Sequence, residues 1–223
     1  IYLTGYFYYG DATSFSIGGV TLTKIGLGDA WVAKLDSTRT VVWAKNFGGN
    51  GASTRGNGIA VDTAGNVYLG GSFDSANLTT TTPALTIIGA QDAFALKLDS
   101  SGTTIWAKNF GGSGAYVTGS GIAVDPIGNV YLGGNFDRSL TIPQLTKLGS
   151  RDAFAIKLDS SGTTTWAKNY GGSGARAWGS SITVDGSGNV YLGGRFQSAN
   201  LTTPALTKLG TLDAFALKLD SSG

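Results

Sequence analysis

The sequence predicts an all-β protein, a β-propeller made of four-stranded antiparallel blades. Three observations lead to this fold class. The same four sequence blocks recur in the same order, and equivalent Asp residues of one block lie 63, 60 and 61 residues apart. Each block is rich in Val, Ile, Phe, Tyr or Trp and is bounded by Gly, Asp, Ser or Asn, whereas no segment sustains helical periodicity. Four strands repeated at a fixed period favour radial repetition over a solenoid, whose repeats are shorter.

The first half of one repeat is expected to be a hairpin. Its strands are 59–62, from the block Gly-Ile-Ala-Val-Asp, and 66–73, from the block Asn-Val-Tyr-Leu-Gly-Gly. Between them Asp62 can bind the backbone two residues on, and Gly65 supplies the positive φ that ends the turn. The second half repeats this design with strands 92–99 and 103–110 around a turn at 99–102.

The connections within and between repeats differ in length. Long segments at 78–88 and 201–209 carry Leu-Thr and Pro-Ala-Leu-Thr elements, which indicates an extra β excursion between the second and third strands. The Gly-Gly-Ser-Gly runs lack the helix and the Lys-Ser/Thr of a phosphate-binding loop, so we interpret them as linkers between blades. In strand 92–99 the bulky side chains alternate with Ala and Lys, and we expect a bulky face to nest against the small face of the next blade.

The strand count gives about four blades, or three and a half blades' worth of strands, in one propeller domain or segment over 1–223. The expected repeats are 1–57 (partial), 58–120, 121–180 and 181–223 (partial). We favour a portion of a larger ring, with a four-bladed ring closed by three-stranded blades as the alternative. Because the chain begins at Ile1 and contains no Met, we expect a processed product or a piece of a longer chain.

The four linked blocks, ending in Asp-Ala-Phe-Ala-Leu-Lys-Leu-Asp-Ser-Ser-Gly and Trp-Ala-Lys-Asn-Phe-Gly-Gly, resemble the β-propeller repeat known as SBBP. The resemblance covers essentially the whole chain. It implies a propeller of the kind found on bacterial secreted or cell-surface proteins, without a defined shared catalytic site. The long segment between the second and third strands departs from the pattern.

The composition excludes most enzyme chemistry. The 223 residues include no His, Cys, Met or Glu, so all 14 acidic residues are Asp. A Ser-His-Asp triad, a thiol nucleophile, a disulfide and a His/Cys zinc site are therefore impossible. A net charge of +2 gives no strong case for nucleic acid, and no apolar run approaches a membrane span. We expect no cofactor, no metal and no catalytic residue.

Most Asp residues occupy repeat-equivalent turn or strand-opening positions, where we interpret them as structural. Calcium binding by these turns is an alternative, although no Asp-x-Asp spacing or bidentate Glu supports it. A carboxylate pair for polysaccharide cleavage would have to come from the repeat positions or from Asp11, Asp74 and Asp137.

Residues that break the repeat are more informative about function, because the scaffold does not require them. In each repeat, the loop before the first strand and the loop after the second strand are expected on one face. Five of the six Arg residues are expected on this face, and Arg39 alone is expected on the opposite face. Exposed aromatic residues beside arginine suit stacking on sugars or anchoring of a protein. The candidate binding residues are Arg55, Tyr116, Arg176, Trp178, Arg138 and Arg195. The simpler interpretation is that loops vary and Arg solubilises them.

These observations predict a non-enzymatic scaffold, extracellular or on a bacterial cell surface, whose loop face mediates binding or assembly with a protein partner or with itself. A lectin-like module that recognises glycan is the alternative from another class. An Asp-based polysaccharide hydrolase or lyase is the second alternative.

Overall fold

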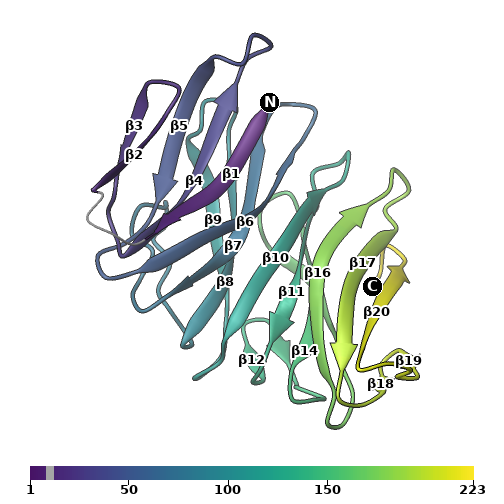
Figure 1. The fold of residues 1–223 in the computed structure, drawn as a ribbon. Coiled ribbons are helices and arrows are strands. Elements are labelled where there is room, and N and C mark those ends of the chain that lie inside the picture. The colour runs from purple at the N-terminus through teal and green to yellow at the C-terminus, as the bar shows by residue number, and fades with distance from the viewer. Residues whose placement is uncertain (9–12) are drawn as a thin grey trace.

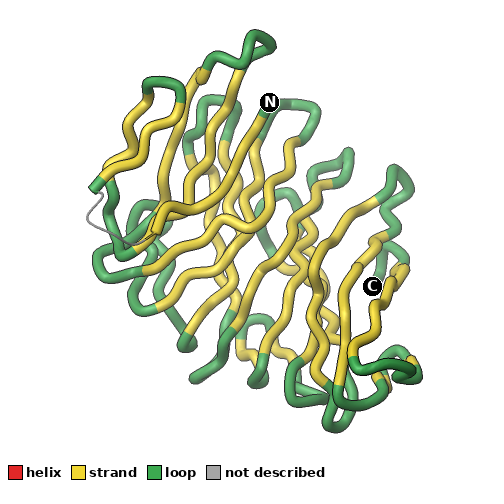
Figure 2. The backbone as a smooth tube through the Cα atoms, viewed as in Figure 1, coloured by secondary structure: helices red, strands yellow, loops and turns green. Residues whose placement is uncertain are grey.

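The structure is a computed structural model that describes residues 1–8 and 13–223. Within these residues all long regular elements are strands, which confirms the all-β prediction (Figure 2). No helix of the described residues is long and apolar enough to cross a membrane.

The long strands form four successive units. We call a set of long strands that pair with each other in antiparallel order a unit. The first unit contains β1 (Tyr2–Tyr8), β4 (Gly28–Leu35) and β5 (Val41–Phe47). The second contains β6 (Ser53–Val61), β7 (Val67–Asp74), β8 (Gln91–Leu98) and β9 (Thr104–Phe110). The third contains β10 (Val117–Val124), β11 (Val130–Phe136), β14 (Asp152–Leu158) and β15 (Thr164–Tyr170). The fourth contains β16 (Arg176–Val184), β17 (Val190–Gln197) and β20 (Leu212–Leu219).

The units follow one another in a row (Figure 1). Single parallel bridges link the start of one unit's third strand to the start of the next unit's first strand, as in Gln91 to Tyr116 and Arg151 to Arg176. The four-stranded order is present in the second and third units, while the first and fourth have three long strands each. Among the described residues no strand pairing joins the first unit to the fourth, so no closed sheet is formed.

Short hairpins occupy the long connections, as the sequence predicts. They are β2 (Ser14–Ile17) with β3 (Val20–Thr23), β12 (Leu140–Thr141) with β13 (Gln144–Leu145), and β18 (Leu201–Thr202) with β19 (Ala205–Leu206). In the second unit the same excursion is reduced to one bridge between Leu78 and Leu85.

The core lies between neighbouring units and is built from one bulky and one small face. Ala93 and Ala95 of β8 are fully buried in one cluster with Leu132, Phe154 and other residues of the third unit. A Cβ atom added at Gly70 would lie 3.0 Å from Leu132 Cδ1, so the two sheets approach closely there. The bulky face of a unit thus packs on the small face of the preceding unit, whereas the sequence analysis expected it to pack on the next one.

The first strands of the second, third and fourth units begin earlier than expected. The sequence placed that of the second unit at 59–62, but β6 begins at Ser53, because a register shift between Gly56 and Gly58 lets the strand continue through a glycine-rich stretch. In β16 the same shift falls between Gly179 and Ser181. Residues expected in loops therefore lie on strands.

Candidate functional site

Three arginine side chains surround one tryptophan where the third and fourth units meet. The guanidinium carbon atoms of Arg176 and Arg195 each lie 5.2 Å from the centroid of the Trp178 ring, and that of Arg151 lies 5.9 Å away. All three distances are within the range of cation–π attraction. We call these four residues the Trp178 cluster.

Backbone pairing explains how the cluster assembles. Trp178 lies directly opposite Arg195 in the antiparallel pair of β16 and β17. Arg151 comes from the third unit, where it bridges to Arg176, and its carbonyl accepts a hydrogen bond of 2.9 Å from the amide of Ala177. Arg176, Trp178 and Arg195 therefore lie on paired strands rather than in loops, and Arg151 lies at the bridge that joins the two units.

The cluster has a positive charge that its own residues do not neutralise. Arg151 donates to Asn135 Oδ1 at 2.8 Å and lies 3.9 Å from a carboxylate oxygen of Asp137. Arg176 and Arg195 are exposed, and Trp178 is half-buried. Three like charges around one ring repel each other, so a bound anion would lower the electrostatic energy of the site.

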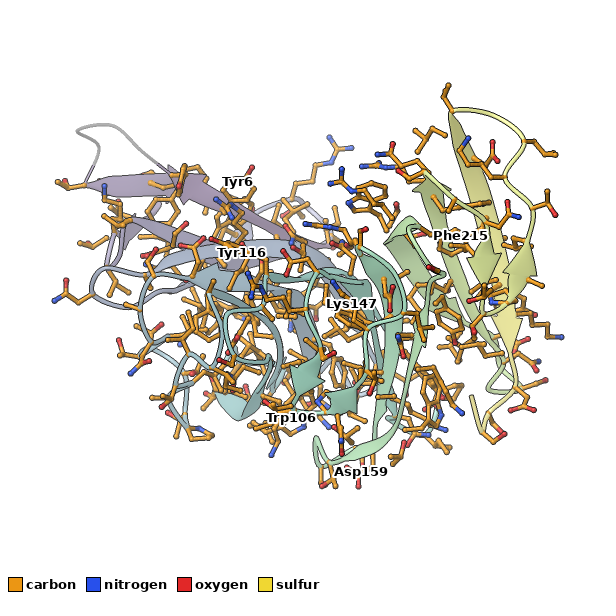
Figure 3. All side chains as sticks on the ribbon, turned by 90° about the horizontal axis from the view of Figure 1, so that it is seen from below. Tyr6, Trp106, Tyr116, Lys147, Asp159 and Phe215 are labelled. Atoms are coloured by element: carbon orange, nitrogen blue, oxygen red, sulfur yellow. The ribbon has the colours of Figure 1, made fainter. Side chains whose placement is uncertain are left out.

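Two predicted residues, Tyr116 and Arg138, lie outside the cluster. Tyr116, just before β10, has 53% of its surface exposed, and its amide donates to Asp137 Oδ1 at 2.9 Å. Arg138 follows Asp137 in the chain, and its Cδ lies 3.9 Å from the position of a Cβ atom added at Gly114. Asp137 thus connects Tyr116 to Arg151. Figure 3 labels Tyr116 toward the end of the row that carries Tyr6, and Phe215 of the fourth unit toward the other end.

Arg55 is separate from the other candidates. It lies on β6, pairs with Asp74 at 3.7 Å, and covers the Tyr8 ring at 5.3 Å from its centroid. The structure therefore brings together Arg176, Trp178 and Arg195 of the six candidates. It corrects the placement of Arg55, Arg176 and Trp178, which lie on first strands and not in loops.

Arg151 is the member of the cluster that was absent from the candidate set. A signal for it exists in the sequence, because the repeat-equivalent positions carry Gly28, Gln91 and Leu212. The contact between Arg151 and Trp178 depends on how two neighbouring units pair, so the sequence alone did not indicate it.

The turn aspartates lie at the opposite end of the units, and their carboxylates accept hydrogen bonds from groups of their own hairpins. Asp62, Asp125 and Asp185 line one cavity of about 230 Å³. Asp125 Oδ2 accepts from Asn129 at 2.7 Å and from the Tyr131 hydroxyl at 3.0 Å. In the described residues no cluster of three or more acidic side chains could hold a metal ion. These contacts favour the structural interpretation over calcium binding.

The carboxylate hydrogen bonds also set the pKa of these groups. Hydrogen bonds from Asn189 lower the pKa of Asp185 to about 2. At Asp92, the second residue of β8, burial raises the pKa although the carboxylate accepts hydrogen bonds from the amides of Ile88 and Gly89 and from Asn109. Burial also raises the pKa of Tyr68 and Tyr131, whose hydroxyls donate to turn aspartates.

The aspartates outside the repeat positions were the candidates for an acid/base pair. Asp74 is paired with Arg55, and Asp137 with Arg151. Asp11 lies outside the described residues.

Comparison with known proteins bears on the repeat. Residues 42–78, 105–135 and 165–200 match the family described as SBBP, beta-propeller repeat. The chain carries the SBBP repeat. The three matched stretches start in β5, β9 and β15, the last long strands of the first three units, and end in or after β7, β11 and β17, the second strands of the units that follow.

No curated protein matches the chain in sequence. A solved structure, described as a protein of unknown function from Bacteroides caccae, is similar with a TM-score of 0.41 and 12% identity. The match covers 87% of this chain and 55% of that protein, so the chain spans about half of its length.

Proposed function

We propose that the chain is a non-enzymatic β-propeller scaffold, extracellular or on a cell surface, whose loop face mediates binding or assembly. In this proposal each unit is a blade, so the chain supplies about four blades, two of them with three long strands. The Trp178 cluster is the observation that supports binding. It holds repeat-breaking residues, places an aromatic ring among three guanidinium groups, and is built from two neighbouring units joined by the bridge between Arg151 and Arg176.

The chemistry of the cluster favours a second, more specific candidate, a lectin-like module for anionic glycan. A guanidinium group binds carboxylate or sulfate through charge-assisted, two-pronged hydrogen bonds. An indole offers an apolar surface for a sugar ring. A protein partner with an acidic surface would use the same charges, and the two candidates differ in the partner rather than in the site.

The test is calorimetric titration with heparin and polygalacturonate as anionic glycans and dextran as the neutral control. Trp178→Ala and Arg176→Ala should each weaken binding of a polyanion about tenfold or more, because each removes a cation–π contact and a direct ligand contact. Arg39→Ala removes the same charge on the opposite face and should leave binding unchanged. If neither Trp178→Ala nor Arg176→Ala weakens binding of the anionic glycans, the lectin-like candidate is contradicted.

The scaffold candidate is tested on the same variants with a protein partner. Acidic-protein binding that is lost in Trp178→Ala and kept in Arg39→Ala, without glycan binding, would favour it. Turnover of a polysaccharide that is abolished by Asp74→Asn or Asp137→Asn would overturn the non-enzymatic proposal.

A further inference from the structure

The sequence contains two Asn-Gly pairs, Asn50-Gly51 and Asn57-Gly58. Asparagine is a thermolabile residue, and it loses its side-chain amide most readily before glycine. The reason is steric, because glycine has no side chain to hinder the attack of its backbone nitrogen on the side-chain carbonyl of the asparagine. The two pairs have the same sequence, but the structure places them in different surroundings.

Asn50 lies at the tip of the turn that joins β5 of the first unit to β6 of the second. The amide of Ala52 donates to Gly49 O at 2.7 Å and closes the turn, and Gly51 has a φ of 78°. Asn50 and Gly51 are both exposed. Among the described residues no hydrogen bond holds the Asn50 side chain. Its carbonyl carbon can therefore approach the Gly51 nitrogen without the loss of a contact.

Asn57 is held on both sides of the bond that would react. It is the extra residue at the register shift of β6, and its side-chain amide donates to Gly119 O of the third unit at 2.8 Å. Gly58 pairs with Gly70 in the sheet, and a Cβ atom added at Gly58 would lie 3.1 Å from Gly121 Cα. Asn57 is exposed as well, so its side-chain hydrogen bond and its strand pairing, rather than burial, distinguish it from Asn50.

The turn itself does not require asparagine. The repeat-equivalent residues are Ser113 and Ser173 in the Gly-Gly-Ser-Gly runs. Those turns have the same positive φ, 63° at Gly114 and 74° at Gly174, and the same closing hydrogen bond. Asn50 is therefore a residue that breaks the repeat without a structural need.

We propose that Asn50 is a site of spontaneous modification in which water is the co-reactant. The Gly51 nitrogen gives up its proton and bonds to the Asn50 side-chain carbonyl carbon, the carbon bond to Nδ2 breaks, and ammonia leaves. Water then opens the resulting cyclic imide at either of its two carbonyl groups. The products are an aspartate at position 50, or an isoaspartate whose main chain runs through the former side chain. Asn57 remains unmodified while the protein is folded.

The modification acts on the junction between the first and second units. Both products add a carboxylate, which lowers the formal net charge of +2 by one. Isoaspartate also inserts a methylene group into the main chain two residues before Ala52. Ala52 is 0% exposed, its carbonyl accepts from the amide of Leu27 at 2.7 Å, and the next residue, Ser53, bridges to Gly28. The longer main chain should weaken these contacts. This inference is independent of the proposed ligand site, which lies between the third and fourth units.

The test is incubation of the 223-residue chain in mildly alkaline heavy-oxygen water, followed by trypsin digestion and mass spectrometry. Cleavage after Lys45, Arg55 and Lys97 places Asn50 in peptide 46–55 and Asn57 in peptide 56–97. In the folded chain, position 50 should convert at least about tenfold faster than position 57, because attack at Asn57 requires local opening of β6. Isoaspartyl methyltransferase should label peptide 46–55. In urea, which removes this protection, both positions should convert at similar rates.

Asn50→Ser is the matched control, because it installs the residue of the other copies at the same turn. Peptide 46–55 of this variant should incorporate no heavy oxygen at position 50. The urea midpoint of wild type should fall during incubation, and that of Asn50→Ser should stay constant.

Folded wild type whose peptide 46–55 stays unmodified while the urea-unfolded chain converts would overturn the proposal. So would equal conversion of positions 50 and 57 in the folded state. Conversion at position 50 with an unchanged urea midpoint would overturn the claim that the modification weakens the junction.

Discussion

Arg151 and Trp178 belong to neighbouring units, yet the guanidinium carbon lies 5.9 Å from the ring centroid of the indole. The contact ties the ligand candidate to the packing of the third unit on the fourth, because Arg151 also donates to Asn135.

Arg151→Ala should therefore lower both polyanion affinity and stability. We expect a loss of about 1 kcal/mol in the free energy of unfolding, as one charge-assisted hydrogen bond and one cation–π contact are removed. Arg176→Ala should weaken binding with little change in stability, since Arg176 is exposed. Urea unfolding at one protein concentration measures the free energy of unfolding of both variants. Equal losses in Arg151→Ala and Arg176→Ala would contradict this prediction.

The aspartate at the start of the third strand of a unit should contribute more to the free energy of unfolding where it is buried. Asp152 is 0% exposed, and its carboxylate accepts from the amides of Leu148 and Gly149 and from Asn169. Asp152→Ala should cost about 3 kcal/mol, because buried amides lose a charged acceptor. Asp213→Ala is the matched control in the same motif, where the amides of Leu209 and Gly210 donate at an exposed site, and should cost less. Equal costs in urea unfolding would contradict this account.

Removing one buried hydroxyl should stabilise the protein. Tyr170 is 6% exposed, and its hydroxyl oxygen has no hydrogen-bond partner in the described residues. The repeat-equivalent residues are Phe47 and Phe110. Tyr170→Phe should raise the free energy of unfolding by about 1 kcal/mol, because a buried polar group without a partner is costly. Phe110→Tyr, the reverse change, should destabilise. A destabilised Tyr170→Phe would show that the hydroxyl has a bonding role.

The hairpin aspartates predict a dependence of stability on pH. The pKa of Asp185 falls from 3.8 to about 2 on folding, so the folded state binds fewer protons between these values. Its contribution is present above the unfolded pKa and is lost as pH falls through the folded pKa. Asp99 and Asp159, whose pKa values are also lowered, act in the same direction. Asp92, whose pKa burial raises, acts in the opposite direction.

Asp185→Asn isolates this contribution. The stability difference between wild type and Asp185→Asn should shrink as pH falls from about 5 to about 2, because protonation removes the charge that the variant lacks. Urea unfolding across this range measures it. A constant difference would mean that the charge of Asp185 does not contribute.

Repetition made the strands and turns predictable. Copies of the Asp-to-Gly turn show the two required features, an Asp99 carboxylate that accepts from the amide of Ser101 and a φ of 83° at Gly102. The early start of β6 was not predictable from Gly56 and Gly58, because glycine in a strand is as typical of a loop as of a bulge.

The site was predictable in part, because residues that break a repeat can be found by alignment of the copies. Trp178 and Arg176 were found in this way. Arg151 was left out because its contact with Trp178 crosses between units, and cross-unit register is a property of the packed sheets. The direction of packing was wrong for the same reason, since alternation in β8 defines two faces without saying which neighbour covers each.

The indole N–H resonances of the five tryptophans test the central claim most directly. Trp43, Trp106 and Trp166 donate their indole N–H to the carbonyl oxygens of Ser100, Ser160 and Ser221, so they serve as internal references. In a nitrogen–proton correlation spectrum, assigned with Trp178→Phe, heparin or polygalacturonate should shift the Trp178 signal saturably and leave these three in place. Dextran should shift none. A Trp178 signal that stays fixed while the polyanion binds elsewhere would contradict the claim that this cluster is the binding site.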